Sequence, residues 1–430
     1  MEKTDVKKDH AQQIFRAAVD AVHPAQIIPA AIQMHEERLL VGEDLYPFTH
    51  FENIYVAGAG KASAAMAYEV EKILTHHIKD GVVAARDWFG QTLKQVRPIY
   101  GGHPLPDSNS VIAAEEITKL LHRLNKKDLL IFLLSGGASS LMMDVPYGST
   151  LNDVNIVFEE LLKSGATIHE LNTVRKHLSE LKGGQLVKKC SGATVVSLII
   201  SDVPGNDLQV IGSGPTVGDE STFEDAMKVL EKYELEKKVP HSIISHLQKG
   251  MEKNIDENPR PGDPVFNNTG NKIIADNNKA LNAAKSKAEE LGYEAEIVTD
   301  TLEGLAEEAA AEWVNEIMST HKKKSCMLAG GETTVQVKGD GKGGRNQQFA
   351  LSAAIALKNS SEITLLAAGT DGSDGPTDAA GAVVDSNSYH DDAEKYLINN
   401  DAYRYFERYG GLIKTGPTHT NVMDLVITLT

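Results

Sequence analysis

Two cations in the sequence stand where a helix is expected to begin after a glycine-rich turn. Lys61 follows Gly60 in GAGKAS, and Arg345 follows the glycines of GDGKGGRNQ. The positive end of the helix dipole repels a cation at this position, so a bound phosphate or carboxylate would explain each of them. The alternative for GAGKAS is a tight turn whose lysine points into water.

Other turns extend this predicted anion site. Glycines let the backbone approach a ligand closely, and turns of small residues open backbone amides to an anion. Each turn has a structural alternative, because glycine turns also serve packing and clustered cations usually form a solvated face. The residues predicted to bind phosphate or substrate are Gly58, Gly60, Ser135, Gly136, Gly137, Ser139, Arg175, Gly212, Gly214, Gly331 and Glu332.

Aspartates follow two further apolar runs. Asp202 comes directly after VVSLIIS and is a candidate general base or metal ligand, with an Asx turn as the alternative. Asp371, Asp374 and Asp378 share one glycine-rich loop after ITLLAAG. Three carboxylates in such a loop suit a hard cation such as Mg²⁺, although aspartate and glycine are also ordinary turn residues.

The elements that must position these residues alternate between apolar runs and helices. The stretches NIYVAGAG, DLLIFLLSGG and TVVSLIISDV each contain a largely apolar run, which is typical of strands buried on both faces. Alternating strands and helices indicate right-handed crossovers and a parallel sheet. The sequence therefore predicts an α/β protein with a Rossmann-like three-layer domain, whose ligands bind at the carboxyl ends of the strands. Residues 9–42 are expected to be helical.

A charged, proline-rich stretch at 251–264 predicts a linker. It divides the chain into an N-terminal Rossmann-like domain over residues 1–255 and a smaller α/β domain over residues 265–430. The strand expected after Asn271 and the final strand DLVITLT both fall in the second domain.

The bulk composition excludes several classes of partner. The 430 residues carry a net charge of −17, which disfavours nucleic acid and anionic membranes. Cys190 and Cys326 form no CxxC pair, so a disulfide scaffold and a thiolate zinc site are not expected. The polar start MEKTDVKKDH resembles no secretory signal, and no run of 18 apolar residues occurs. A cytoplasmic location is therefore expected, while the oligomeric state is undetermined and a homodimer is left open.

A series of long motifs resembles the family of glycerate 2-kinases that carry a C-terminal MOFRL domain. The resemblance covers nearly the whole chain. The motifs that carry it are GAGKAS, GGHPLPDSNS, LLSGGASSLM, LNTVRKHLSELKGGQL, SDVPGNDLQVIGSGPT, GGETTVQVKGDGKGGRNQ, AAGTDGSDGPTDAAGAVVD and TGPTHTNVMDL.

The resemblance implies a Rossmann-like domain, a MOFRL-type α/β domain and an active site in the cleft between them. It implies ATP-dependent phosphorylation of D-glycerate to 2-phosphoglycerate with Mg²⁺ or another divalent cation. Lys61 of GAGKAS and Arg345 of GGRNQ match residues proposed as catalytic in that family. The roles of Asp202 as a catalytic proton acceptor and of the three loop aspartates as metal ligands are inferred from their chemistry.

Two other functions are considered. An NAD(P)H-dependent hydroxypyruvate reductase would use Gly58 and Gly60 as part of a dinucleotide fingerprint, but Ser63 replaces the third glycine or alanine and Lys61 would crowd the pyrophosphate. A sugar-phosphate sensor would need the same anion sites but no metal, which leaves the acidic loop without a role.

Overall fold

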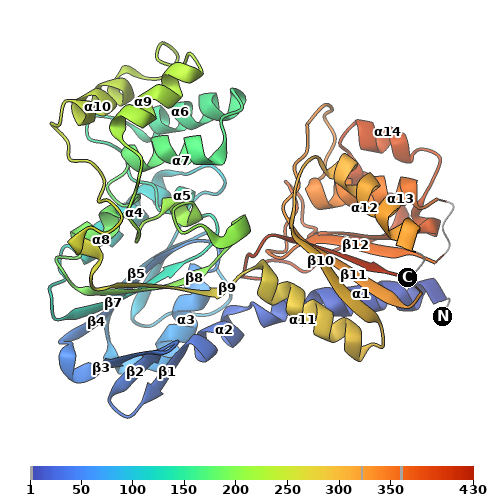
Figure 1. Cartoon of the computed structure of the whole chain (residues 1–430), viewed down its shortest axis with the longest axis horizontal. Helices are drawn as coiled ribbons and strands as arrows, with labels where there is room; N and C mark the ends of the chain where they lie inside the picture. The colour runs from blue at the N-terminus through green and yellow to red at the C-terminus, as the bar shows by residue number, and fades with distance from the viewer. Residues whose placement is uncertain (1–2, 321–322, 359–361) are drawn as a thin grey trace. The chain divides into compact units, whose positions relative to one another are not determined.

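The computed structural model describes residues 3–320, 323–358 and 362–430, which form two compact units (Figure 1). The central unit is Ile27–Ile274. The terminal unit joins the chain up to Gln26 with Ala275–Thr430. This differs from the division expected from sequence, because the first residues belong with the C-terminal part of the chain.

The central unit contains the predicted parallel sheet. Its strand order is β6-β5-β4-β7-β8-β9, and the first five of these strands run parallel. In chain order the parallel strands have the arrangement 3-2-1-4-5, as in a Rossmann fold, with the switch point between β4 and β7. The strands are β4 (Asn53–Ala59), β5 (Ile78–Ala85), β6 (Val96–Tyr100), β7 (Asp128–Leu134), β8 (Thr194–Ile200) and β9 (Thr269–Ala275).

Strand β9 corrects the expected domain division. Residues after Asn271 were expected to open the second domain, but β9 lies beside β8 at the edge of the central sheet. The predicted linker at 251–264 therefore connects two parts of one unit.

Helices of the central unit form two groups. The first group packs around the sheet and comprises α3 (Ser63–Leu74), α4 (Ser108–Leu121), α5 (Ala138–Leu141) and α8 (Gln185–Lys189). Asp107 caps α4 by accepting a hydrogen bond from the Ser110 amide. The second group has an apolar core of its own and comprises α6 (Leu151–Lys163), α7 (Ile168–His177), α9 (Phe223–Lys232) and α10 (His241–Met251).

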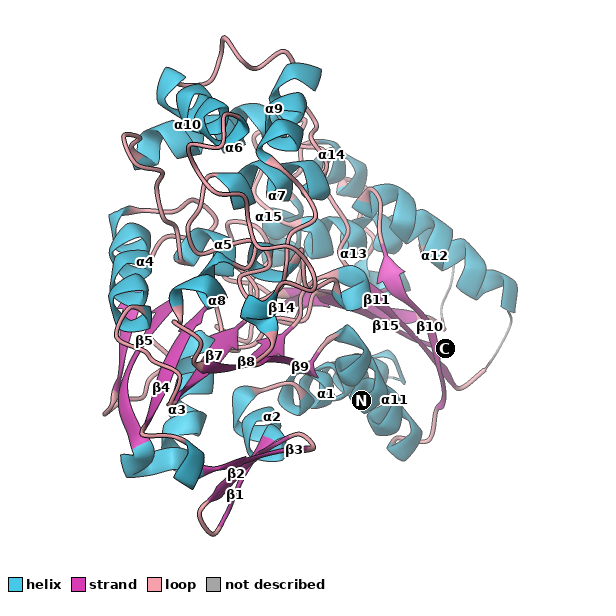
Figure 2. Cartoon of the chain, turned by 60° about the vertical axis from the view of Figure 1, so that its left-hand side comes forward, coloured by secondary structure: helices cyan, strands magenta, loops and turns pink. Residues whose placement is uncertain are grey.

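Residues 32–42, expected to be helical, instead form strands and turns of a small sheet that extends to residue 47. After α2 (Pro24–Ala31) the chain forms a small antiparallel sheet of β1 (Ile32–His35), β2 (Arg38–Val41) and β3 (Asp44–Pro47), drawn in magenta at the foot of Figure 2. Glu36 and Gly42 have positive φ values of 53° and 61° at the two turns. Leu39 and Val41 are buried on alternate positions, which is the period of a strand.

The terminal unit is a second three-layer α/β structure with a mixed sheet. Its strand order is β10-β11-β15-β12-β13-β14, in which only β10 and β11 are parallel neighbours among the described strands. The strands are β10 (Glu294–Leu302), β11 (Ser325–Gly331), β12 (Thr364–Gly369), β13 (Gly381–Asp385), β14 (Leu412–Ile413) and β15 (Asp424–Leu429). The carboxyl ends of β11 and β12 therefore meet the start of β15 at one edge.

Helices cover both faces of this second sheet (Figure 1). Helix α1 (Lys3–Ala21) packs beside α11 (Asn277–Glu290) and against β12 and β15. The opposite face carries α12 (Ala306–Thr320), α13 (Arg345–Ala356), α14 (Ala393–Ile398) and α15 (Ala402–Tyr409).

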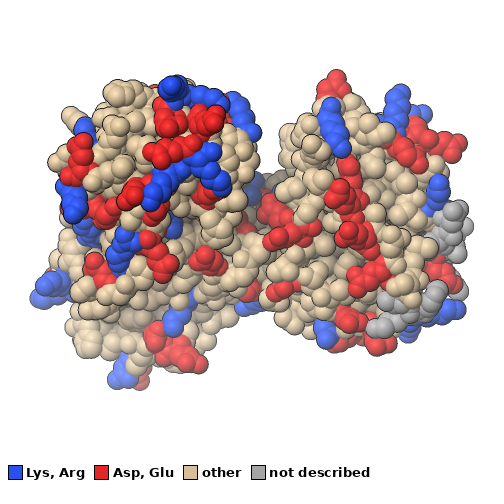
Figure 3. Space-filling model, turned by 45° about the horizontal axis from the view of Figure 1, so that its top comes forward, with Lys and Arg blue, Asp and Glu red and all other residues tan. Residues whose placement is uncertain are grey.

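Acidic side chains are prominent on the surface, as expected from the net charge of −17. On the face drawn in Figure 3, acidic side chains form a line across the terminal unit, while acidic and basic side chains are mixed on the central unit. Among the described helices, none combines the length and the apolar character that crossing a bilayer requires.

Candidate active site

Two turns interlock at the switch point of the central sheet. The Lys61 amide after β4 donates to the Gly136 carbonyl after β7 at 2.8 Å, and the Ala62 amide donates to Ser135 Oγ at 3.0 Å. Gly60 has a φ of +132°, and a Cβ placed on it would lie 2.1 Å from Ser135 Oγ. Only glycine therefore permits this contact. Helix α3 begins at Ser63, so Lys61 stands before the helix rather than in its first turn as expected.

A second basic side chain lies beside Lys61. A Cβ placed on Gly137 would lie 2.7 Å from His103 Cδ2 and 3.5 Å from Lys61 Cγ, so both side chains border this glycine. His103 belongs to the GGHPLPDSNS motif but was not among the predicted site residues. Its sequence signal is weak, because a single histidine after a strand is more often structural than functional.

A buried polar chain links the SGGASS turn to α7. Ser139 Oγ and Ser213 Oγ are 2.8 Å apart, and Ser213 Oγ donates to Asn172 Oδ1 at 2.9 Å. Arg175 Nη1 donates to the same Asn172 oxygen at 3.0 Å. The predicted residues Ser139 and Arg175 are thus brought together, and Asn172 and Ser213 connect them.

Arg175 lacks a counter-charge. Its Nε atom is buried without a hydrogen-bond partner, its guanidinium stacks 4.7 Å from the centre of the Phe158 ring, and no carboxylate pairs with it in the described part of the chain. Burial lowers the pKa of Arg175 to about 10. A half-buried cation of this kind favours binding of an anion.

Some of the predicted glycines have a packing role. A Cβ on Gly58, inside β4, would lie 2.5 Å from the Leu133 carbonyl oxygen. A Cβ on Gly212 would lie 2.8 Å from Leu134 Cδ1, and the Gly214 carbonyl accepts a hydrogen bond from the Gly184 amide at 2.8 Å. These glycines shape the turns that carry the polar residues.

Asp202 occupies the predicted position. It follows β8 by two residues and is half-buried. Since β4, β7 and β8 are parallel, Lys61, Ser135 and Asp202 lie at the same edge of the sheet.

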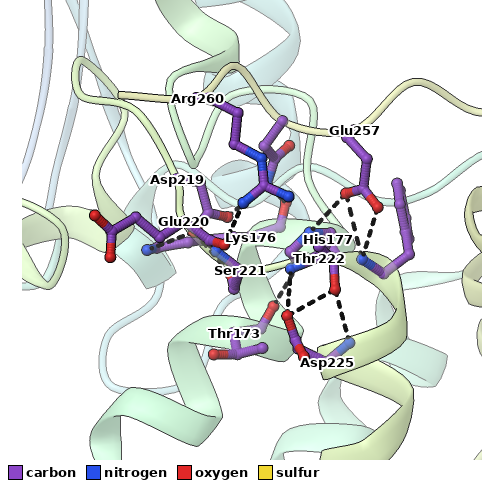
Figure 4. A network of polar contacts seen from close by, with 12 residues as sticks. Thr173, Lys176, His177, Asp219, Glu220, Ser221, Thr222, Asp225, Glu257 and Arg260 are labelled. Carbon is purple, nitrogen blue, oxygen red and sulfur yellow. Dashed lines mark hydrogen bonds and ion pairs between the residues drawn. The ribbon is translucent and has the colours of Figure 1, made fainter. Parts of the chain in front are cut away.

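Adjacent to Arg175 in sequence, Lys176 points to a different part of the helical group and pairs with Asp219. Figure 4 shows Lys176 and Asp219 with His177 and Glu257 in a polar network. Lys176 Nζ lies 3.2 Å from Asp219 Oδ1, and both side chains are buried. The two opposite charges neutralise each other, and the ion pair connects α7 to the segment before α9.

Arg345 in the terminal unit starts α13, as predicted. Its Nε and Nη2 atoms donate to the two carboxylate oxygens of Asp424 at 2.5 and 2.9 Å, and its Nη1 atom lies 3.0 Å from Glu332 Oε1. Burial lowers the pKa of Arg345, but the two carboxylates outweigh burial and raise it overall. The predicted residues Arg345 and Glu332 are brought together, and Asp424 is a partner that sequence analysis left out of the site.

The structure separates the three loop aspartates. Asp374 is buried and accepts hydrogen bonds from the Asn346 and Gln347 amides at 3.1 and 2.8 Å, at the start of α13. Burial raises the pKa of Asp374 to about 6, although these amides oppose the shift. Asp371 accepts hydrogen bonds from the Ser373 amide and hydroxyl. Asp378 is exposed.

Asp378 binds the hydroxyl of Tyr403 and the ammonium of Lys414, at 2.7 and 2.9 Å. In the ranges that the structure describes, no group of three or more His, Cys, Asp or Glu side chains is arranged to hold a metal ion. The predicted three-aspartate metal cage is therefore not assembled in this structure.

A different pair of carboxylates converges on the end of β12. A Cβ placed on Gly369 would lie 3.2 Å from Asp424 Oδ1 and 3.5 Å from Asp371 Oδ1. At the end of β11, a Cβ on Gly331 would lie 2.3 Å from the Leu302 carbonyl oxygen, so Gly331 permits close approach of two chain segments. The edge thus gathers Asp371, Asp424 and the guanidinium of Arg345.

Comparison with known proteins gives a consistent result. A family model described as a domain of unknown function (DUF4147) matches residues 10–248, and the MOFRL family model matches residues 325–424. The chain is 40% identical over 427 residues to the glycerate 2-kinase of Pyrococcus horikoshii, covering 96% of this chain and 94% of that protein. It is 38% identical to the D-glycerate 2-kinase of Thermotoga maritima, covering 98% of each.

A solved structure and one differently named relative complete the comparison. The structure of glycerate kinase from Thermotoga maritima matches with a TM-score of 0.84 and 37% identity over 99% of each chain. A protein of Agrobacterium vitis that bears a hydroxypyruvate reductase name is 38% identical over 414 residues, covering 93% of this chain and 92% of that protein. The matches span both units and include the motifs that form the two edges described above. The chain belongs to the family of glycerate 2-kinases with a MOFRL domain.

Proposed function

We propose that the protein transfers the γ-phosphoryl group of ATP to the 2-hydroxyl of D-glycerate, which yields ADP and 2-phosphoglycerate. The observation that carries the proposal is a Rossmann-type switch point together with Arg175, a half-buried arginine whose Nε atom is buried without a hydrogen-bond partner and which pairs with no carboxylate among the described residues. Both features suit an anionic substrate, and phosphoryl transfer demands positioning and charge stabilisation rather than covalent chemistry.

In this proposal Arg175 binds the glycerate carboxylate, aided by the hydroxyls of Ser139 and Ser213. Asp202 accepts the proton of the 2-hydroxyl as its oxygen attacks the γ-phosphorus. Lys61 and Arg345 stabilise the negative charge of the transferring group, while the bond to the β-phosphate oxygen breaks and ADP leaves. Lys61 belongs to the central unit and Arg345 to the terminal unit.

Mg²⁺ enters the proposal with the nucleotide. It usually binds one or two carboxylates together with substrate phosphates, and seldom needs a cage made only of protein ligands. Asp371 fits the role of such a carboxylate better than Asp374, which caps α13, or Asp378, which binds Lys414. When bound, the ion neutralises charge on the phosphates.

The geometry of GAGKAS disfavours the reductase alternative. A dinucleotide fingerprint uses its glycines to admit the pyrophosphate. Here Gly58 faces the Leu133 backbone, and the space beside Gly60 is taken by Ser135. The turn therefore offers little room for a pyrophosphate.

The first test is an assay of ADP release with D-glycerate, ATP and Mg²⁺, beside an assay of NADH consumption with hydroxypyruvate. We expect ADP release that requires all three components, together with formation of the 2-phosphate isomer. Consumption of NADH without ADP release would contradict the proposal.

Variants of the two cations test their roles. Lys61→Ala and Arg345→Lys are each expected to lower kcat at least 100-fold, because each removes or displaces charge that stabilises the transferring group. Lys72→Ala is the matched control, since Lys72 is an exposed lysine of α3 that pairs with Glu69. Near-normal kcat in both site variants, with unchanged thermal unfolding, would exclude the assigned roles.

We further propose that the reaction takes place in the cytoplasm. Cys190 and Cys326 are both buried and unpaired, which suits a reducing compartment. The negative net charge gives no support to a nucleic-acid partner.

A further inference from the structure

The terminal unit contains a cavity of about 720 Å³ between α1 and the segment 412–419. Its volume lies within the range of about 300–1,000 Å³ that is typical of small-molecule sites. Helix α1 presents one face to it, with lining residues spaced at three and four positions. These residues are Gln12, Phe15, Arg16, Val19 and Asp20, and His23, just after the helix, also lines the cavity.

The lining has an apolar base and a polar rim. Phe15, Val19 and Ile413 line the cavity and are buried. Around them, Gln12 and Asp20 provide hydrogen-bonding groups, and the imidazoles of His23 and His419 add flat polar surfaces. A three-carbon hydroxy acid is too small to fill this space, whereas a heteroaromatic base with an attached sugar has an apolar body and a hydrogen-bonding edge.

Direct contacts join the cavity to the edge that carries Arg345. Thr418 lines the cavity, its hydroxyl donates to the Thr370 carbonyl at 2.6 Å, and its amide donates to the Asp371 carbonyl at 3.3 Å. Asp371 and Asp424 both border Gly369, and Asp424 binds Arg345. The cavity and the proposed phosphate-binding residues thus lie along one continuous set of contacts within the terminal unit.

We propose that this cavity binds the nucleoside part of the phosphoryl donor, with the phosphates extending past Thr418 toward Asp371 and Arg345. The apolar base receives the nucleobase, and Gln12 and Asp20 accept hydrogen bonds from the sugar hydroxyls. This inference rests on the proposed function, since it locates the donor of the same reaction.

A pair of tryptophan substitutions on α1 tests the site. Gln12→Trp places a large ring in the cavity, while Gln13→Trp makes the same change at the next position, where the side chain binds Asp9 and does not line the cavity. Binding of ATP with Mg²⁺ is measured by isothermal titration calorimetry on the full chain. We expect Gln12→Trp to weaken ATP binding at least tenfold and to leave D-glycerate binding unchanged, and Gln13→Trp to bind ATP as the unaltered chain does.

Normal ATP binding by Gln12→Trp would overturn this site but leave the kinase proposal intact. Failure of the unaltered chain to bind ATP would overturn the proposed donor and the site together. A second measurement needs no variant: ADP should slow amide hydrogen exchange in residues 12–23 and 412–419. Protection confined to other segments would also overturn the site.

Discussion

The guanidinium of Arg175 is the clearest electrostatic signal in the molecule. A buried cation costs free energy unless an anion shares its surroundings. In the described part of the chain, Arg345 has two such partners in Asp424 and Glu332, whereas Arg175 pairs with no carboxylate and donates to the neutral amide oxygen of Asn172. The electrostatics of Arg175 therefore suit a residue that binds an anionic ligand, whereas the position of Arg345 is fixed by its two carboxylate partners.

Replacement of Arg175 tests this difference. Arg175→Gln should raise the KM for D-glycerate at least tenfold, because the carboxylate loses its charged partner. Thermal stability should be unchanged or slightly higher, since a buried charge is removed. Arg123→Gln is the control, because Arg123 is an exposed residue that pairs with Asp80. A lower Tm with an unchanged KM would show that Arg175 is only structural.

Asp374 gives a prediction about pH. Burial raises its pKa from 3.8 to about 6, so the folded state binds this proton more tightly than the unfolded state. Its contribution to stability is present below pH 4 and is lost as the pH rises through 6. The side-chain amide of the variant Asp374→Asn does not titrate, so the variant does not lose this stability as the pH rises. The Tm of the variant minus the Tm of the unaltered chain should therefore be larger at pH 7.5 than at pH 5. A Tm difference that is constant with pH would contradict the assignment.

Single residues were predicted where a local pattern identifies them. Lys61 and Arg345 were found because each follows glycines and precedes a helix. His103, Asn172, Ser213 and Asp424 were missed as site residues because their contacts join segments far apart in the sequence. The three loop aspartates were grouped by proximity in sequence, yet their side chains serve different hydrogen-bond partners.

At the scale of elements, the turns after β4 and β7 depend on each other. The continuous apolar runs correctly predicted the buried parallel strands, because such strands need apolar residues on both faces. Residues 32–42 were expected to be helical but form strands β1 and β2 with their turns, since short half-buried strands leave only a few apolar residues from which to read a period. Which turns would interlock could not be predicted, because strand order is a property of the whole sheet.

The interlocked turns predict a strong effect of a side chain at Gly60. In Gly60→Ala the added Cβ would lie 2.1 Å from Ser135 Oγ and 2.4 Å from the Ser135 carbonyl oxygen, so the backbone must move. Gly90→Ala is the matched control, since Gly90 also has positive φ but open space around it. We expect Gly90→Ala to cost about 1–2 kcal/mol of unfolding free energy and Gly60→Ala clearly more, as measured by urea denaturation. An equal loss of unfolding free energy in both variants would show that the contact with Ser135 does not contribute to the cost of Gly60→Ala.

At the scale of the whole molecule, α1 is an element that sequence analysis placed in the N-terminal domain but that belongs to the terminal unit. An amphipathic pattern shows that one face of a helix is buried but does not identify the partner. Helix α1 packs on α11, β12 and β15, which follow it by more than 250 residues in the chain. The division of the chain at a single linker fails for this reason, while the α/β class and the two-unit organisation were predicted from the alternation of elements.

Because α1 belongs to the terminal unit, a substitution that leaves a void beside this helix should destabilise the terminal unit. Ile14 is fully buried, and Ile14→Ala should cost about 2–5 kcal/mol. Because α1 packs on the terminal sheet, amide hydrogen exchange should accelerate in α11, β12 and β15, while β4 and β7 of the central unit keep their protection. Ile168→Ala, at a position that is 51% exposed, is the control and should change neither unit. Faster exchange in β4 and β7 alone would assign α1 to the central unit, whereas the expected pattern would show that the two ends of the chain fold as one body.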